Sequence, residues 1–288
     1  MAPTIEILRL AAFTSDPAGG NPGGVAIVEA MPDASEMQRL AAEVGYSETG
    51  YFMPQGPAGE GVRAVDVRFF SPAAEVDFCG HVTIAGAVAL AERYGPGRFA
   101  LSTRAGPVEV ETMRRADGLV DATLTSVAPR VVALPDALLE VLLEALRMPP
   151  GALDQMLPTA IGYAGVWHPI VPLRDRATLA GLDYDYEALR TIMVRERWTT
   201  IQVVWRESAE RWHARDPFAF GGVVEDPATG AAAAALGAYT RRFGLVQPPA
   251  ELIVIQGEDM GRPSTIRVEV TPGDAGIRVS GTAVPIPT

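Results

Sequence analysis

The chain has 288 residues, of which 48% are hydrophobic and 20% charged, a balance typical of folded globular proteins. With 24 basic and 35 acidic residues its net charge is -11, which speaks against a basic face for nucleic acid. One cysteine excludes an internal disulfide, and no apolar stretch matches a signal peptide or a membrane span, so we expect a cytoplasmic protein without membrane contact.

The first half of the chain is predicted to alternate short strands with helices. A capping-box pattern at Asp33 and Glu36 opens a helix, and Gly45 is placed to end it. The Gly- and Pro-rich segment 15–24 predicts a turn between two strands. In chain order the expected elements are strands 5–13 and 25–28, the helix before Gly45, strands 47–52 and 64–70, helix 84–94, and strands 98–103, 106–113 and 120–125.

The second half follows a similar rhythm. An amphipathic helix is expected where leucines recur on one side, and Asp185 is placed to cap a later helix. In chain order the expected elements are helix 136–147, strands 159–165 and 168–172, helix 185–194, strand 200–205, helix 231–243, and strands 251–256, 265–270 and 277–279.

Each half contains a helix rich in Ala and Gly, preceded by a loop that contains Gly, at 79–87 and 226–233. Helices without a polar face are usually surrounded by other elements. The simplest architecture is therefore α+β, with two pseudo-symmetric domains, each a curled β-sheet wrapped around a central helix, and a cleft between them. We expect one domain over 1–125, completed by the C-terminal strand at about 277–288, and the other over 126–276.

Side chains at these features are candidates for chemistry. Glu48 lies among apolar neighbours, where a partly desolvated carboxylate suits general acid/base work, although an exposed strand-edge glutamate fits the pattern too. His81 begins the first central helix, as a catalytic group or as a capping or packing histidine. Asp226 precedes the second central helix, where it is either catalytic or an N-cap.

The starts of the two central helices offer unpaired N–H groups and the positive end of a helix dipole. Both features suit a carboxylate or enolate oxygen, so a small anionic metabolite is the expected ligand. Gly80 and Gly230 would let that ligand approach the backbone, or they serve only as turn glycines.

Cys79 is interpreted as a buried structural thiol, with a thiolate base as the alternative. A racemase that uses two thiols is excluded, because the chain has one cysteine. No metal site is predicted, since the 3 histidines, His81, His168 and His213, lack ligand spacing. The chain also has no Walker loop or dinucleotide fingerprint, so no cofactor is expected.

Several segments together resemble the PhzF family of phenazine biosynthesis, within the diaminopimelate epimerase-like superfamily. They occur in the order of the family and span nearly the whole chain. The matching segments are Gly20-Asn21-Pro22, Ser47-Glu48-Thr49, Phe78-Cys79-Gly80-His81-Val82-Thr83, Glu225-Asp226-Pro227-Ala228-Thr229-Gly230, Gln256-Gly257 and Met260-Gly261-Arg262-Pro263-Ser264.

The resemblance implies an isomerase without metal or organic cofactor, and a homodimer. Glu48 would be the general acid/base, assisted by His81 and Asp226. The residues implied to hold the substrate, chiefly through backbone amides at the helix starts, are Ser47, Gly80, His81, Gly230 and Ala231.

Two departures from the family pattern concern the substrate. Ala231 stands where relatives commonly have serine, and Val82 stands where proline is usual. Hydrolytic C–C cleavage at the same site, or a non-catalytic scaffold that kept the fold, are the alternative functions. The sequence leaves substrate, pathway and any need for the dimer open.

Overall fold

The structure is a computed structural model that describes residues 5–56 and 61–287. The chain forms two compact units, Met1–Thr125 with Ser280–Thr288, and Ser126–Val279. The first unit is thus built from two separate stretches of chain, whereas the second is one continuous stretch. The boundary near the C-terminus falls at 279/280, where about 277 was expected.

The sheet of the first unit closes on itself as a barrel. Its strands are β1 (Leu8–Ala12), β2 (Asn21–Ile27), β3 (Thr49–Pro54), β4 (Val62–Phe70), β6 (Arg98–Thr103), β7 (Gly106–Arg114), β8 (Val120–Thr125) and β17 (Arg278–Pro285), with short β5 (Glu75–Val76) beside β4. Pairing runs in the order β17-β1-β2-β3-β4-β6-β7-β8, and β8 pairs with β17 to complete the circle.

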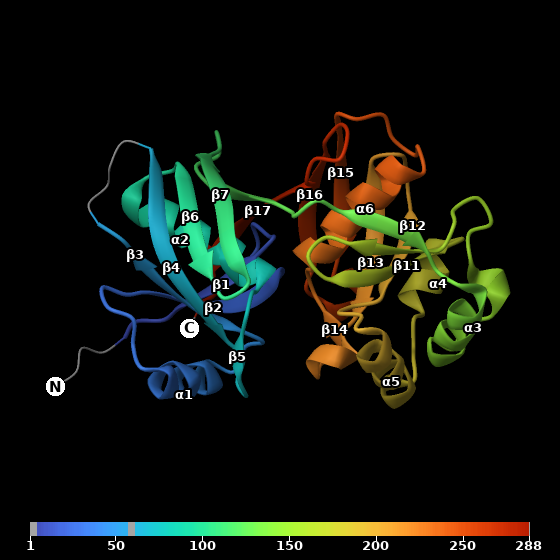
Figure 1. Ribbon diagram of the computed structural model, residues 1–288, viewed down its shortest axis with the longest axis horizontal. Coiled ribbons are helices and arrows are strands. Elements are labelled where there is room, and N and C mark those ends of the chain that lie inside the picture. Colours follow the sequence, from blue (N-terminus) through green and yellow to red (C-terminus); the bar gives the residue numbers. More distant parts are fainter. Residues whose placement is uncertain (1–4, 57–60, 288) are drawn as a thin grey trace. The chain divides into compact units, whose positions relative to one another are not determined.

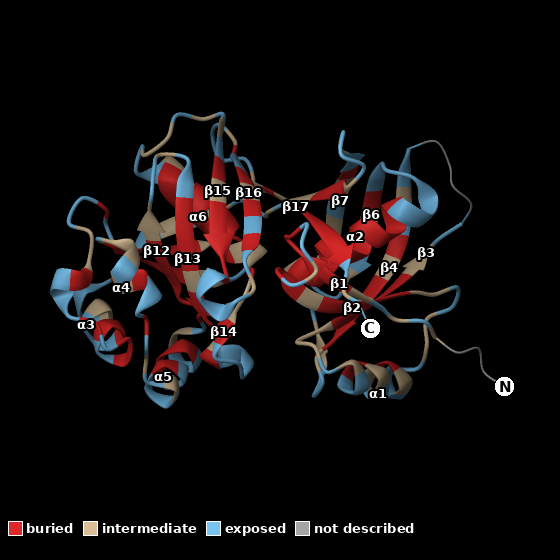
Figure 2. Ribbon diagram, turned by 180° about the vertical axis from the view of Figure 1, so that it is seen from behind, coloured by how far each residue is buried: buried red, intermediate tan, exposed pale blue. Residues whose placement is uncertain are grey.

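Helix α2 (Gly80–Tyr94) lies inside this barrel, and all its residues from His81 to Ala91 are buried (Figures 1 and 2). Its small side chains let the strands approach closely. A Cβ at Gly86 would lie 2.0 Å from the Phe52 ring of β3, so only glycine fits there. Helix α1 (Ala34–Val44) packs outside, where Met37 joins a buried cluster with Tyr51.

The second unit has the same design. Its strands are β9 (Arg130–Ala133), β10 (Ala160–Tyr163), β11 (Trp167–Leu173), β12 (Gln202–Arg206), β13 (Arg211–Pro217), β15 (Ala250–Gln256) and β16 (Ser264–Val270), paired in that order, with short β14 (Glu225–Asp226) beside β13. Central helix α6 (Gly230–Arg242) is buried from Ala232 to Thr240. A Cβ at Gly237 would lie 2.8 Å from Val268 of β16.

The outer face of the second sheet carries further helices and its own apolar cluster. These helices are α3 (Asp136–Ala145), α4 (Arg176–Ala180) and α5 (Tyr186–Glu196), and the single-turn helices are η1 (Pro150–Ala152), η2 (Ala219–Gly221) and η3 (Glu258–Met260). Leu142 and Leu146 of the expected leucine-rich helix are buried in this cluster, and Asp185 caps α5 by accepting a hydrogen bond from the Ala188 N–H.

Strand pairing repeats between the units. In the first unit β2 and β3 are parallel, β3 and β4 antiparallel, β4 and β6 parallel, and β6 and β7 antiparallel. Strands β11, β12, β13, β15 and β16 repeat that series. The predicted α+β fold, a curled sheet around a central helix in each of two pseudo-symmetric halves, is confirmed.

Several local predictions were wrong. β2 begins at Asn21, inside the predicted turn. The capping box does not form, because Glu36 pairs with Arg39 and Asp33 makes no side-chain cap bond. Strand β13 was not predicted at all. Both central helices begin earlier than expected, at Gly80 and Gly230. Within residues 5–56 and 61–287, no helix combines the length and apolarity needed to cross a bilayer.

Candidate active site

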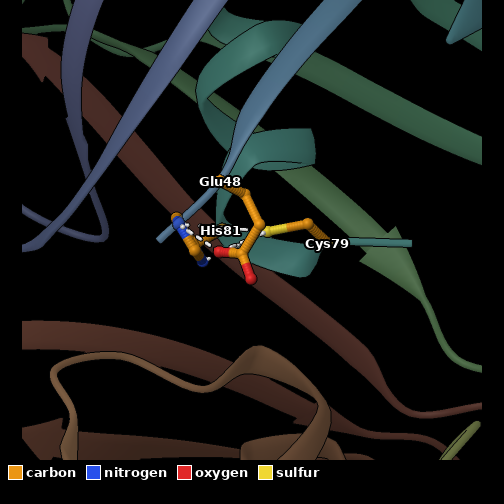
Figure 3. Close-up of side chains that lie close together, drawn as sticks. All are labelled: Glu48, Cys79 and His81. Carbon is orange, nitrogen blue, oxygen red and sulfur yellow. Dashed lines mark hydrogen bonds and ion pairs between the residues drawn. The ribbon is translucent and has the colours of Figure 1, made fainter. Parts of the chain in front are cut away.

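Glu48, Cys79 and His81 meet at the start of α2 (Figure 3). The Glu48 carboxylate lies 3.6 Å from His81 Nε2, and Cys79 Sγ lies 3.5 Å from the same carboxylate oxygen. Cys79 Sγ is also 3.4 Å from His81 Nδ1. The hydroxyl of Ser47 lies 3.4 Å from His81 Nε2. The sequence placed Glu48 in a strand, but β3 begins one residue later, which leaves Glu48 on the segment that enters the strand.

The local backbone explains this convergence. The first turn of α2 is fixed by Thr83, whose N–H and hydroxyl both donate to the Cys79 carbonyl. The Glu48 carbonyl accepts the Gly24 N–H of β2, which anchors the segment before β3. Gly23 of β2 faces His81, since a Cβ there would lie 3.5 Å from the imidazole ring. A side chain at this position would clash with Val82, which a Cβ would approach to 2.8 Å.

The site is shielded from water without being closed. The Glu48 side chain is 17% exposed and the His81 side chain 7%. A Cβ added at Gly80 would meet no protein atom within 4 Å, so the space beside the first helical residue is open. This space leaves room for a ligand beside the backbone at the helix start.

Cys79 is more than the buried structural thiol that the sequence suggested. It is buried, yet its sulfur contacts the two candidate catalytic side chains. Glu48, Cys79 and His81 are also a set that could hold a metal ion, because their donor atoms lie within 4.8 Å of one another. Thiolate, imidazole and carboxylate are donors that zinc accepts. Histidine spacing could not reveal this set, because it draws on different residue types and separate elements.

Asp226 lies in the second unit, on β14. Its Oδ2 accepts a 2.6 Å hydrogen bond from the Thr229 hydroxyl, and its backbone carbonyl accepts the Gln256 side-chain amide at 2.7 Å. The N-cap residue of α6 is Thr229, so the N-cap interpretation of Asp226 was wrong. Gly230 and Ala231 form the first turn of α6, as expected.

Behind Asp226 lies a buried polar group that the sequence did not indicate. Asp216, His168 and Thr200 are each 0% exposed. His168 Nδ1 is 2.9 Å from the Thr200 hydroxyl, which donates to Asp216 Oδ2 at 3.3 Å. Burial raises the pKa of Asp216 well above its usual value and lowers that of His168 to about 3. Asp216 was missed because its strand, β13, was not predicted.

The structure brings four of the predicted site residues close together in the first unit, namely Glu48, His81, Ser47 and Gly80. The other candidates, Asp226, Gly230 and Ala231, gather at the start of α6 in the second unit.

The fold is shared with epimerases. A probable proline racemase from Agrobacterium radiobacter K84 aligns with a TM-score of 0.65 at 14% identity, covering 98% of this chain and 91% of that one. A phenazine biosynthesis protein of the PhzF family from Bacillus anthracis aligns with a TM-score of 0.85 at 26% identity, covering 98% and 97%. The architecture is therefore that of the epimerase-like isomerases.

The family of phenazine biosynthesis-like proteins, PhzC-PhzF, matches residues 10–288, and this chain belongs to it. Its curated relatives include the trans-2,3-dihydro-3-hydroxyanthranilate isomerase of Pseudomonas chlororaphis, which is 31% identical over 253 residues, 88% of this chain and 86% of the relative. The resemblance seen in the sequence is confirmed, and the protein is an isomerase.

Proposed function

We propose that this isomerase moves a proton on a small carboxylate-bearing metabolite, with Glu48 as general acid/base and without a metal or organic cofactor. The observation that carries the proposal is the contact between the shielded Glu48 carboxylate and His81, 3.6 Å apart at the start of α2. A paired carboxylate and imidazole can take up and return a proton. The relative from Pseudomonas chlororaphis is named for a hydroxyanthranilate, a carboxylate, which supports the substrate class.

In the proposed reaction the Glu48 carboxylate takes a proton from a carbon next to an unsaturated or carbonyl-bearing centre. The electron pair of the broken C–H bond spreads toward that centre, and the Glu48 carboxyl group, which can exchange its proton with water, returns a proton to a different carbon. His81 stabilises the charge on Glu48 as the proton moves, and Asp226 is proposed to assist the transfer. Because atoms and electrons balance within one substrate, the step needs no oxidant or co-substrate.

Backbone N–H groups at the starts of α2 and α6 are proposed to hold the carboxylate of the substrate. These groups point along the helix dipole, so they stabilise negative charge that develops in the transition state. Ala231 contributes only its N–H group, because it lacks the hydroxyl common in relatives. Ser47 is proposed to bind the substrate beside His81, whose Nε2 lies 3.4 Å from its hydroxyl.

The test is proton exchange in D2O, followed by NMR over a panel of small carboxylates that includes cyclic dienyl amino acids, alkenyl prolines and diaminopimelate. Wild-type protein should place deuterium on carbon. Glu48→Gln should lower turnover by about 100- to 10,000-fold with little change in binding, since positioned proton transfer contributes that much. Glu43→Gln is the matched control, because Glu43 is a solvent-exposed glutamate of α1.

Comparable turnover in Glu48→Gln would remove Glu48 from the proposal. A product of altered mass would instead indicate hydrolytic C–C cleavage, because an isomer keeps the mass of its substrate. Binding without exchange across the panel would favour a non-catalytic scaffold. The homodimer implied by the resemblance stays a prediction, which light scattering of the purified protein checks.

A further inference from the structure

Asp216 is a fully buried carboxyl group. Its neighbour Arg215 directs its guanidinium to Glu225, with Nη2 2.6 Å from Oε2, and to backbone carbonyls that include Ala180 and Leu182. Across the part of the chain that the structure describes, no basic side chain pairs with Asp216, and its Oδ1 has no hydrogen-bond partner. An ionised carboxylate in such surroundings would be costly, so the neutral acid is favoured.

A second carboxyl group lies next to Asp216. β13 and β14 are antiparallel, and Asp216 stands directly opposite Asp226 in their pairing. Opposite residues in such a ladder have Cβ atoms about 5 Å apart. Two carboxylates at that separation repel each other, so they tend to hold one proton between them.

The hydrogen bonds of the Thr229 hydroxyl favour Asp226 as the ionised member of the pair. Its proton is given to Asp226 Oδ2 at 2.6 Å, a short bond of the kind that carboxylates accept. Its oxygen accepts the Gln256 side-chain amide at 3.0 Å. One hydroxyl has a single proton, so Thr229 cannot also donate to Asp216, although it is close enough to affect that group. Its remaining lone pair suits a proton held by Asp216.

The charged surroundings agree with this assignment. Glu225 and Asp226 of β14 are the acidic groups that act on Asp216, and both oppose its ionisation. On the other side stand the Thr200 hydroxyl and, behind it, the buried His168, whose lowered pKa of about 3 keeps it uncharged. The first turn of α6 contains no acidic residue and supplies no side-chain charge.

We propose that Asp216 and Asp226 share one proton across the Thr229 hydroxyl, with Asp216 as the neutral partner that keeps Asp226 ionised. Asp216 is then a positioning residue, because it acts on the reaction through Asp226. This role rests on the proposed function, in which Asp226 assists proton transfer, whereas the shared proton does not. At alkaline pH Asp216 loses its proton and becomes negatively charged. This second negative charge beside Asp226 lowers the contribution of Asp226 to proton transfer.

Infrared difference spectroscopy of the purified protein tests the shared proton without any turnover. At neutral pH the wild-type protein should show the carbonyl absorption of a protonated carboxyl group, shifted in D2O. Asp216→Asn should remove this absorption, and Asp226→Asn should keep it. Asp121→Asn is the matched control, since Asp121 is a buried carboxylate with Arg115 3.6 Å away. Absence of the absorption in the wild type, or its survival in Asp216→Asn, would overturn the proposal.

The pH profile of kcat/KM tests the positioning role. Asparagine has nearly the same shape as aspartic acid but no carboxyl proton to lose. The decline of kcat/KM at alkaline pH should therefore begin at least about one pH unit higher in Asp216→Asn than in the wild type. At the pH where the wild type has fallen tenfold, this variant should therefore retain most of its own maximum. A purely structural role would lower activity by one factor at every pH and leave the decline in place, which would contradict the proposal. If Asp226→Asn is fully active while the infrared result holds, the proposed catalytic role of Asp226 fails and the shared proton stands.

Discussion

The two units apply one scaffold to different chemistry. In the first unit Phe70 stands opposite Glu75 in the strand pairing, and in the second unit Pro217 stands opposite Glu225. These two pairs occupy equivalent positions in the repeated fold. Counting from these pairs, His81 corresponds to Ala231. The first central helix therefore begins with an imidazole, and the second begins without a side chain that can exchange a proton.

The same registers relate the carboxyl groups. Thr49 stands opposite Phe70, and Ile201 donates its N–H to Pro217, so Thr200 occupies the place of Glu48. In turn, Asp216 occupies the place of Phe69. Phe69 makes edge contacts with other aromatic rings, whereas Asp216 accepts the Thr200 hydroxyl. The duplicated fold thus keeps an acidic residue near each helix start but takes it from different strands.

What the units keep in common is an ion pair beneath each helix start. Arg68 contacts Glu75 through two hydrogen bonds of 2.7 and 2.8 Å. Arg215 contacts Glu225 in the corresponding position, at 3.1 and 2.6 Å. The turn leading into each central helix is therefore held by the same bidentate pair, while the side chains at the two helix starts differ.

The largest expected effect comes from breaking these ion pairs. Arg215→Met should lower the free energy of unfolding by about 3–5 kcal/mol, because it leaves Glu225 buried without its partner. Glu225 is 3% exposed and Arg215 13%, against 19% for Glu75 and 30% for Arg68. Arg68→Met should therefore cost less, about 1–2 kcal/mol, since water screens its pair more. Urea unfolding of both variants checks the order, and equal losses would contradict it.

Packing around the central helices should give the next largest effect. Gly86→Ala should destabilise the protein by about 1–3 kcal/mol, because the added methyl group would lie 2.0 Å from the rigid Phe52 ring. Gly237→Ala should cost nearer 1 kcal/mol, since the ends of the Val268 and Ile277 side chains can move aside. Thermal unfolding monitored by circular dichroism compares the two, and a larger loss at Gly237 would show that the second unit packs more rigidly around its central helix.

An effect confined to acidic pH is a difference in stability caused by His168, which occupies the place of Gly23 in the strand register. Burial lowers its pKa to about 3, whereas the unfolded chain binds a proton below about 6.5. Unfolding therefore takes up a proton between these values, and stability is lost as pH falls through this window. At about pH 5 the loss is near 2 kcal/mol.

His168→Gln should remove the loss of stability that the wild type shows at acidic pH. Measured by urea titration, the free energy of unfolding of this variant minus that of the wild type should rise by about 2 kcal/mol from neutral pH to about pH 5. His213→Gln is the control, because His213 contacts the carboxylates Glu207 and Glu258 and lies outside the buried group. An equal gain in both variants would indicate a general effect of removing histidine.

The order of elements and the paired central helices were predictable because alternating apolar residues and small-residue runs are local signals. β13 was not, since Arg211, Arg215 and Asp216 give it no apolar alternation. Two of them are placed by partners on other strands or segments, Arg215 by Glu225 and Asp216 by Thr200. Likewise the glycines that open β2 look like a turn, but Gly23 and Gly24 are needed in a strand because Val82 and Thr49 pack closely against them.

The sequence predicted only part of the site, because local patterns do not record contacts between distant segments. Glu48 and His81 came from motifs and were found together. The contact of Cys79 with both, and the buried partner of Asp226, depend on strand register, which no local pattern records. The sequence therefore identified the candidate residues at each helix start, and it missed the buried groups that contact them.

The position of β17 bears on how the protein is made. Residues Ala283–Pro285 pair with β1, and the Thr282 hydroxyl binds the Val120 carbonyl of β8. The first barrel therefore lacks one strand until residue 285 has been synthesised, although residues 1–125 are synthesised before the second unit. The surroundings of Glu48 reach their final form only after β17 has joined the barrel.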